Sequence, residues 1–136
     1  MKVAFTTEDG KHVNAHFGWA STIVIHDVFP DRSNFVACIE FGESLAEDGN
    51  EDKLGPKLEA IRDCAILYVA AIGGSAAARV VGKNIHPVKV AETEAIENIL
   101  LQLQKVLAGN PPPWLRKALN KNRERILDFE DEVVHG

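Results

Sequence analysis

Cysteine, positive charge and long apolar runs are scarce in this sequence, and each scarcity excludes a class of protein. The two cysteines, Cys38 and Cys64, are too few for the disulfide framework of a small secreted domain. Each lies in or beside an apolar segment, so we expect buried, reduced thiols in a cytoplasmic protein. A formal net charge of −5 argues against a sequence-independent grip on nucleic acid, which requires a basic surface.

The sequence also lacks the features of a membrane-spanning or exported protein. No run approaches the roughly 18 consecutive apolar residues that span a bilayer, and the mostly apolar stretch 64–71 has the length of a strand. Residues 1–10 lack the apolar core and cleavage site of a signal peptide. With 46% apolar and 26% charged residues over 136 positions, the chain fits one globular domain with a single core.

What is present is a group of short strands followed by alternating helices and strands. β-branched and aromatic residues predict three early strands, at 2–5, 21–29 and 35–41, with a tight turn at 30–34. Helical spacing of apolar residues, and one strand without polar alternation, predict the later elements. These are a helix around 54–64, a buried strand at 65–74, a helix at 74–84, a strand at 86–91 and a helix at 93–109 capped by Thr93.

The order of these elements predicts an α/β fold. The early strands form an antiparallel meander, and helical crossovers make the later strands parallel with right-handed connections. The result is a mixed five-stranded sheet flanked by helices in the order βββαβαβα, which matches a ribonuclease-H-like three-layer fold. We expect the acidic stretch 42–55 to be mostly exposed loop. The domain is placed at residues 1–108, followed by a Pro-rich linker and helical tail at 109–136.

This topology places the candidate site. Ligands of parallel α/β sheets gather beyond the carboxyl ends of the strands. The loop after the first strand, which carries His16, and the turn Gly73–Gly74–Ser75 both lie at that edge. His16 and Gly73 are therefore expected to converge although they are 57 positions apart. His86 should lie at the opposite edge.

The histidines of the first loop invite a metal-binding interpretation. His12 and His16 have the i, i+4 spacing of zinc-binding helices, but the glycines around them indicate a loop, and HExxH and CxxC patterns are absent. An exposed loop histidine without a special role is one alternative. The other is a single imidazole that anchors a preassembled iron cluster, since neutral imidazole is a good ligand for transition metals.

The turn GGSAAA also has two interpretations. Gly73 and Gly74 permit close approach of another group, and the N–H groups of the following helix form a modest anion site. The alternative is a tight strand-to-helix turn that uses small residues for packing. Neither a phosphate loop nor a GxGxxG fingerprint is present, and Arg79 either adds positive charge or faces solvent.

Catalytic chemistry is poorly supported. A ribonuclease-H-type nuclease needs several carboxylates to hold two metal ions, and neither the first strand nor the buried strand carries one. Ser75 has no GxSxG elbow around it. Cys38 is predicted to pack in the core, with a role as second ligand left open, and Cys64 lies away from the proposed site. We therefore expect a protein that is not an enzyme.

Two segments together resemble a known family. DGKHVNAHFGWASTIVIHDV (9–28) and CAILYVAAIGGSAAARVVGKNIHPVKV (64–90) are similar to the nitrogenase iron–molybdenum cofactor biosynthesis domain family. Its members include NifX, NifY, the core of NafY and the C-terminal domain of some NifB proteins. The resemblance covers residues 1–107, and PPPWLRKAL (111–119) resembles the NifX branch in particular.

The resemblance implies a ribonuclease-H-like fold without nuclease activity and a cytoplasmic role in nitrogen fixation. It also implies binding of NifB-co, an iron–sulfur precursor of the iron–molybdenum cofactor, or of a later precursor. The histidine of the HFG motif, here His16, is associated with cofactor binding, whereas His12 remains an auxiliary candidate. Implied partners are the donor NifB and the NifEN scaffold.

Together these observations predict a non-catalytic carrier of that precursor. His16 would ligate the cluster, and the backbone of Gly73, Gly74 and Ser75 would stabilise its negative charge. One histidine plus hydrogen bonds suits reversible holding, whereas four cysteines would retain a cluster.

A different class of function remains open. An interaction module that chaperones nitrogenase assembly would hold no cluster, and the basic segment Arg116–Arg125 beside Trp114 would then dock an acidic partner. The plainer interpretation of that segment is a solvated helix face.

Overall fold

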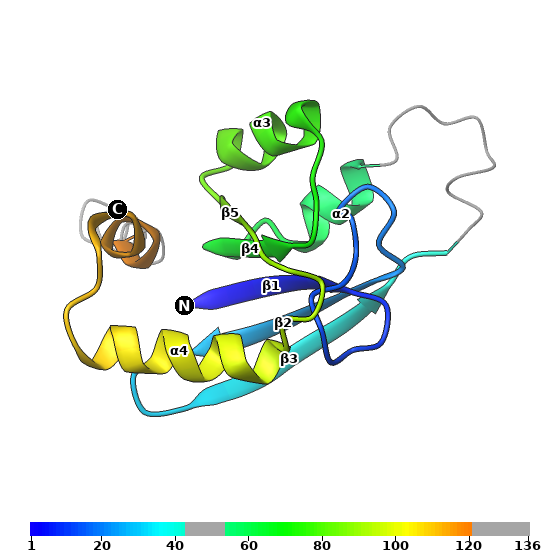
Figure 1. The fold of residues 1–136 in the computed structure, drawn as a ribbon. Coiled ribbons are helices and arrows are strands. Elements are labelled where there is room, and N and C mark those ends of the chain that lie inside the picture. The colour runs from blue at the N-terminus through cyan, green and yellow to red at the C-terminus, as the bar shows by residue number, and fades with distance from the viewer. Residues whose placement is uncertain (43–53, 121–136) are drawn as a thin grey trace, which may run out of the picture.

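A computed structural model describes residues 1–42 and 54–120 (Figure 1). Its elements are β1 (Lys2–Thr7), β2 (Thr22–Val28), β3 (Ser33–Glu40), α2 (Gly55–Ala60), β4 (Ile66–Val69), α3 (Gly74–Gly82), β5 (His86–Lys89) and α4 (Ile96–Ala108). Residues 113–120 are also helical. Most of the predicted acidic loop and the tail beyond residue 120 lie outside the described residues. No helix within 1–42 and 54–120 is long and apolar enough to cross a membrane.

The strands form one mixed sheet in the order β3-β2-β1-β4-β5. β2 pairs antiparallel with both β1 and β3, and the short turn at 29–32 can only reverse the chain between β2 and β3. β4 runs parallel to both β1 and β5, and α3 provides the crossover that makes β4 and β5 parallel. The predicted five-stranded α/β architecture is confirmed.

Helices cover both faces of the sheet, which gives three layers (Figure 1). Successive side chains of a strand point to opposite faces, so Phe5 and Ile66 pack in the cluster that contains α4, while Ala4 and Leu67 pack against α2 and α3. All four residues of β4 are buried, as expected for a central parallel strand. The helix at 113–120 joins the α4 side through buried Leu115 and Ala118.

Two local predictions are wrong. Thr93 does not cap α4: its N-cap is Ala95, and no side chain caps the helix. A backbone acceptor from the first loop takes the place of a side-chain cap, since the Ile96 N–H donates to the Lys11 carbonyl at 2.8 Å. The Val13 N–H donates to the Glu94 carbonyl at 3.0 Å and holds the loop against the residues before the helix.

The second error concerns Cys38. It is exposed rather than packed in the core, because β3 is an edge strand and none of its residues is buried. An apolar sequence alone does not distinguish an edge strand from a central one. Cys64 is buried, as predicted.

Candidate functional site

Residues 8–21, here called the carboxyl-end loop, pair with other backbone at two places, the end of β4 and the start of α4. The Ala70 N–H donates to the Ala15 carbonyl at 3.1 Å, and the Phe17 N–H donates to the Ala71 carbonyl at 2.9 Å. A second pairing joins His12 to Ala95 at the start of α4. Figure 1 shows the loop at the end of the sheet where α3 and α4 begin. The loop is therefore an extension of the sheet.

His16 lies at the first of these pairings. It forms an isolated parallel bridge with Ala71, two residues before Gly73, so the backbone brings the histidine alongside the turn as the strand topology predicts. Its side chain is half-buried, and its Nδ1 accepts a hydrogen bond from the Gly18 N–H at 3.0 Å. In the neutral ring the proton is then on Nε2.

His12 lies in a different setting. Its Nδ1 is 2.7 Å from Asp9 Oδ2, while Asp9 Oδ1 accepts from the backbone N–H groups of Lys11 and His12 at 2.8 and 2.9 Å. These bonds, that of the imidazole first, hold the pKa of the Asp9 carboxyl well below its usual range. His12 also lines a cavity with His26, beside α4. The structure does not place it in one cluster with His16, and no group of three potential metal-ligating side chains exists among the described residues.

The turn before α3 presents open backbone. Gly73 is the N-cap, no side chain caps the helix, and Gly73, Gly74 and Ser75 are all exposed. A Cβ added at Gly73 or Gly74 would meet nothing within 4 Å, and neither glycine has a positive φ. Packing within the described chain therefore does not require glycine here. The open space instead lets a bulky anion approach the first N–H groups of the helix.

Arg79 does not strengthen this anion site. It belongs to the last turn of α3, so its charge lies towards the far end of the helix.

Lys57 is a residue of this edge that the sequence analysis missed. It is 5% exposed, and its ammonium donates to the carbonyls of Phe17 and Gly18, each at 3.1 Å. The signal was a lysine on the apolar face of a helix, three residues after Leu54 and one before Leu58. Burial lowers the pKa of Lys57, and the Glu8 carboxylate opposes that shift.

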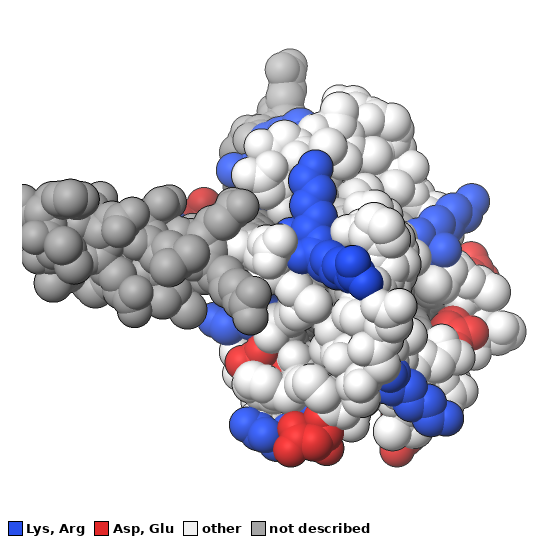
Figure 2. Space-filling model, turned by 90° about the vertical axis from the view of Figure 1, so that its left-hand side faces the viewer, with Lys and Arg blue, Asp and Glu red and all other residues white. Residues whose placement is uncertain are grey.

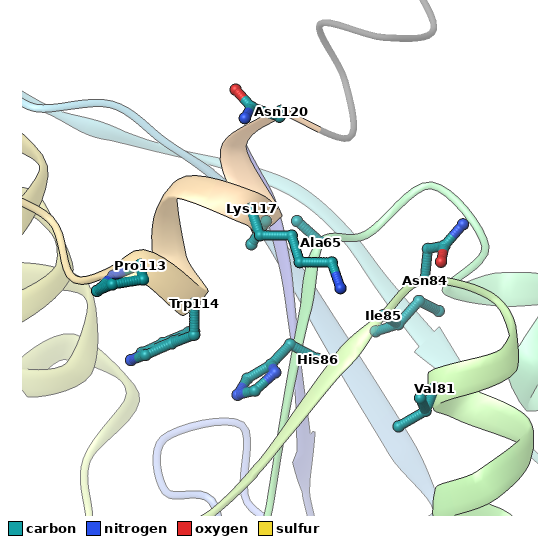
Figure 3. A pocket seen from close by; sticks show the side chains of 10 residues that line it. Ala65, Val81, Asn84, Ile85, His86, Pro113, Trp114, Lys117 and Asn120 are labelled. Atoms are coloured by element: carbon teal, nitrogen blue, oxygen red, sulfur yellow. The ribbon is translucent and has the colours of Figure 1, made fainter.

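The opposite edge carries a second feature, the amino-end cavity, of about 470 Å³. His86 stacks on Trp114 with ring centroids 4.6 Å apart, and Lys117 extends from the helix at 113–120 towards the opening (Figure 3). The remaining lining residues are Ala65, Val81, Asn84, Ile85, Pro113, Ala118 and Asn120. Burial first, and the charge of Lys117 second, lower the pKa of His86.

Charge at this end of the molecule is uneven. Figure 2 shows Lys and Arg side chains at the centre of the face, whereas its rim carries side chains of both signs. The ten residues that line the cavity include one lysine and no acid. The described part of the predicted basic segment, 116–120, lies here, and residues 121–125 lie outside the described chain. His86 pairs with Ile66 at the start of β4 and His16 with Ala71 beyond its end, so the two histidines lie at opposite edges, as predicted.

Comparison with known proteins identifies similar chains. The family model described as dinitrogenase iron-molybdenum cofactor matches residues 1–106. Protein NifX of Herbaspirillum seropedicae is 58% identical over 98% of this chain and 91% of its own. Protein NifX of Sinorhizobium fredii is 44% identical over 97% of this chain and 86% of its own.

Two more distant matches extend this comparison. FeMo cofactor biosynthesis protein NifB of Bradyrhizobium diazoefficiens is 29% identical over 82% of this chain but only 25% of its own length. Among solved structures, the crystal structure of PH0822 matches with a TM-score of 0.54 at 18% identity, over 84% of this chain and 98% of that one. At that identity the match supports the fold alone.

Proposed function

The chain belongs to the dinitrogenase iron–molybdenum cofactor family, and we propose that it is a non-catalytic carrier in the biosynthesis of that cofactor. Its cargo is an iron–sulfur precursor, NifB-co or a later one, held in the cytoplasm for transfer. The observation that carries this proposal is the backbone bridge between His16 and Ala71, two residues before the open turn Gly73–Gly74–Ser75.

The chemistry of these groups suits an anionic cluster. An imidazole nitrogen binds iron, and the first N–H groups of α3 stabilise negative charge on sulfide. Two glycines without a packing role leave room for cargo larger than a single ion. One side-chain ligand and a set of backbone donors at the carboxyl end of the sheet support this proposal.

Such a site also allows release. Ligation through Nε2 requires the ring proton to move to Nδ1, and that move breaks the hydrogen bond from the Gly18 N–H. The empty protein regains this bond when the cargo leaves, which lowers the free energy of release by about 1 kcal/mol. The chain has two cysteines in all, so a four-cysteine cage, which would retain a cluster, cannot form.

We propose NifB as donor and the NifEN scaffold as acceptor of the cargo. The similarity of this chain to a quarter of a NifB protein supports a role beside the enzyme that makes the precursor. The amino-end cavity supports a second candidate function, a module that docks an acidic segment of the assembly machinery. His86, Trp114 and Lys117 combine aromatic surface with positive charge, the combination that such a segment would need.

Anaerobic titration with isolated NifB-co tests the proposal. Wild type, His16→Ala and the matched histidine variant His86→Ala are each mixed with NifB-co, and iron is measured in the protein peak after gel filtration. We expect iron on wild type and His86→Ala, and at least about 30-fold weaker binding, equivalent to about 2 kcal/mol, for His16→Ala. Iron retained equally by all three would refute His16 as ligand and direct attention to His12 and Cys38. Wild type without iron would favour the docking module.

A further inference from the structure

The ammonium of Lys57 lies beneath the carboxyl-end loop, 40 positions along the chain from Phe17. Its two bonds of 3.1 Å to consecutive carbonyls, those of Phe17 and Gly18, hold the backbone that follows His16. A lysine that is only 5% exposed loses most of its hydration, and a hydrocarbon side chain in its place would avoid that cost. The two hydrogen bonds to the loop therefore indicate why a charged residue is found at this buried position.

One peptide group joins this lysine to the histidine. The carbonyl of the Phe17–Gly18 peptide accepts from Lys57, and the N–H of the same peptide donates to His16 Nδ1 at 3.0 Å. A positive charge at the oxygen of a peptide group polarises it and makes its N–H a stronger donor. Lys57 and the imidazole are therefore linked through a single rigid unit, although they do not share a direct hydrogen bond.

We propose that Lys57 is a positioning residue for His16, acting through the Phe17–Gly18 peptide group to fix the imidazole ring and to keep its proton on Nε2. This is the form of the ring in the empty protein, and ligation through Nε2 then requires the proton to leave that nitrogen. This role for the ring rests on the proposed carrier function, whereas the effect of Lys57 on the ring belongs to the empty protein.

The buried charge has a second effect on the same site. An ammonium within hydrogen-bond distance of residues 17 and 18 attracts an anionic cargo at His16, and the low dielectric of the loop strengthens that attraction. The Gly18 hydrogen bond acts in the opposite sense, because it must break on ligation. Charge acts over a longer range than one neutral hydrogen bond, so removing Lys57 weakens cargo binding overall.

The position of the ring proton is measured first, by two-bond ¹H–¹⁵N correlation spectra of the empty protein. We expect His16 of wild type in the Nε2–H form, and a mixture of both tautomers in Lys57→Met. Lys57→Arg, which keeps a cationic donor, should remain close to wild type. Lys105→Met removes an equal charge from an exposed position on α4 and should leave the His16 signals unchanged.

Two results of this experiment would overturn the proposal. One is an Nδ1–H proton on wild-type His16, a result that needs no variant and so stands even if Lys57→Met does not fold. The other is a folded Lys57→Met whose His16 signals match wild type. Neither depends on NifB-co, so failure of the carrier function leaves this test intact.

Titration with NifB-co then measures the consequence for the cargo. We expect Lys57→Met to bind about tenfold more weakly than wild type, with Lys105→Met unchanged and Lys57→Arg restoring most of the affinity. Equal affinity of Lys57→Met and wild type would show that the charge does not act on the cargo. Absence of binding by wild type would count against the carrier and not against the ring geometry.

Discussion

The two ends of the sheet present different chemical groups. At the carboxyl end the chain presents backbone: a loop paired to the sheet, exposed glycines and one half-buried histidine held by a peptide N–H. At the amino end it presents side chains: His86 stacks on Trp114, and both line a cavity together with Lys117 and several apolar residues (Figure 3). Fixed backbone donors suit an anion, whereas aromatic side chains suit a protein segment. The comparison teaches that this chain carries two chemically different surfaces, which the length of its sheet keeps apart.

The largest expected effect tests how firmly the amino end belongs to the fold. Leu115 is 1% exposed in the cluster that contains α4, so Leu115→Ala should destabilise the protein by about 3 kcal/mol. Leu101→Ala, at a site 51% exposed, should cost less than about 1 kcal/mol. Urea unfolding measures both values. Equal and small losses would mean that the helix at 113–120 is not part of the cooperative unit.

The next effect tests the anion site. Gly74→Asp places a carboxylate in the first turn of α3, where a Cβ has room and negative charge stabilises a helix. We expect NifB-co affinity to fall about tenfold while thermal stability stays the same or rises. Gly74→Ala, which adds the Cβ without the charge, should bind nearly as wild type does. Anaerobic titration and thermal melts give the two quantities, and unchanged affinity of Gly74→Asp would remove the α3 backbone from the site.

A smaller effect tests the anchoring of the loop. The buried Thr6 hydroxyl donates to the Ala15 carbonyl at 2.8 Å, and Thr6→Val replaces it by an apolar group of similar shape. We expect a loss of about 1 kcal/mol, together with faster amide exchange at His16 and Phe17. Thr22→Val, on the neighbouring strand, is the control. If faster amide exchange in Thr6→Val were confined to other parts of the chain, the backbone pairing alone would be enough to fix the loop.

The smallest effect is a pH dependence at the amino end. Burial and Lys117 lower the pKa of His86, and burial does the same for His26, so the folded protein disfavours both imidazolium ions. The unfolded chain then binds more protons below pH about 6.5, and stability should fall as the pH drops from there towards 5. His86→Gln should reduce this dependence without removing it. Thermal melts across this range measure it, and parallel curves for the two proteins would exclude a contribution from His86.

Sequence patterns predicted the backbone arrangement at the carboxyl end of the sheet better than the side-chain contacts at its amino end. The convergence of His16 with the Gly73 turn follows from a general rule about parallel strands, so it could be predicted without side-chain detail. Trp114 stacking on His86 depends on where a helix beyond three prolines returns to the sheet. Hydrophobic periodicity does not fix that return path.

The local errors have the same origin. Thr93 is a residue type that often caps helices, but the first N–H of α4 is bound by a backbone carbonyl of the loop instead. Cys38 has apolar neighbours in sequence, yet its strand lies at the sheet edge. Lys57 was overlooked because the carbonyls that it binds belong to residues far away in the chain. In each case a tertiary contact outweighs the local propensity.

The pairing of the carboxyl-end loop with Ala70, Ala71 and the start of α4 has a kinetic consequence. A loop that folds together with the sheet is already ordered when it meets its ligand, so capture adds little loss of backbone entropy. Encounter is then limited by diffusion and orientation rather than by a slow rearrangement. For the proposed carrier, we therefore expect the lifetime of the loaded state to depend on how quickly the bond between iron and the His16 imidazole breaks.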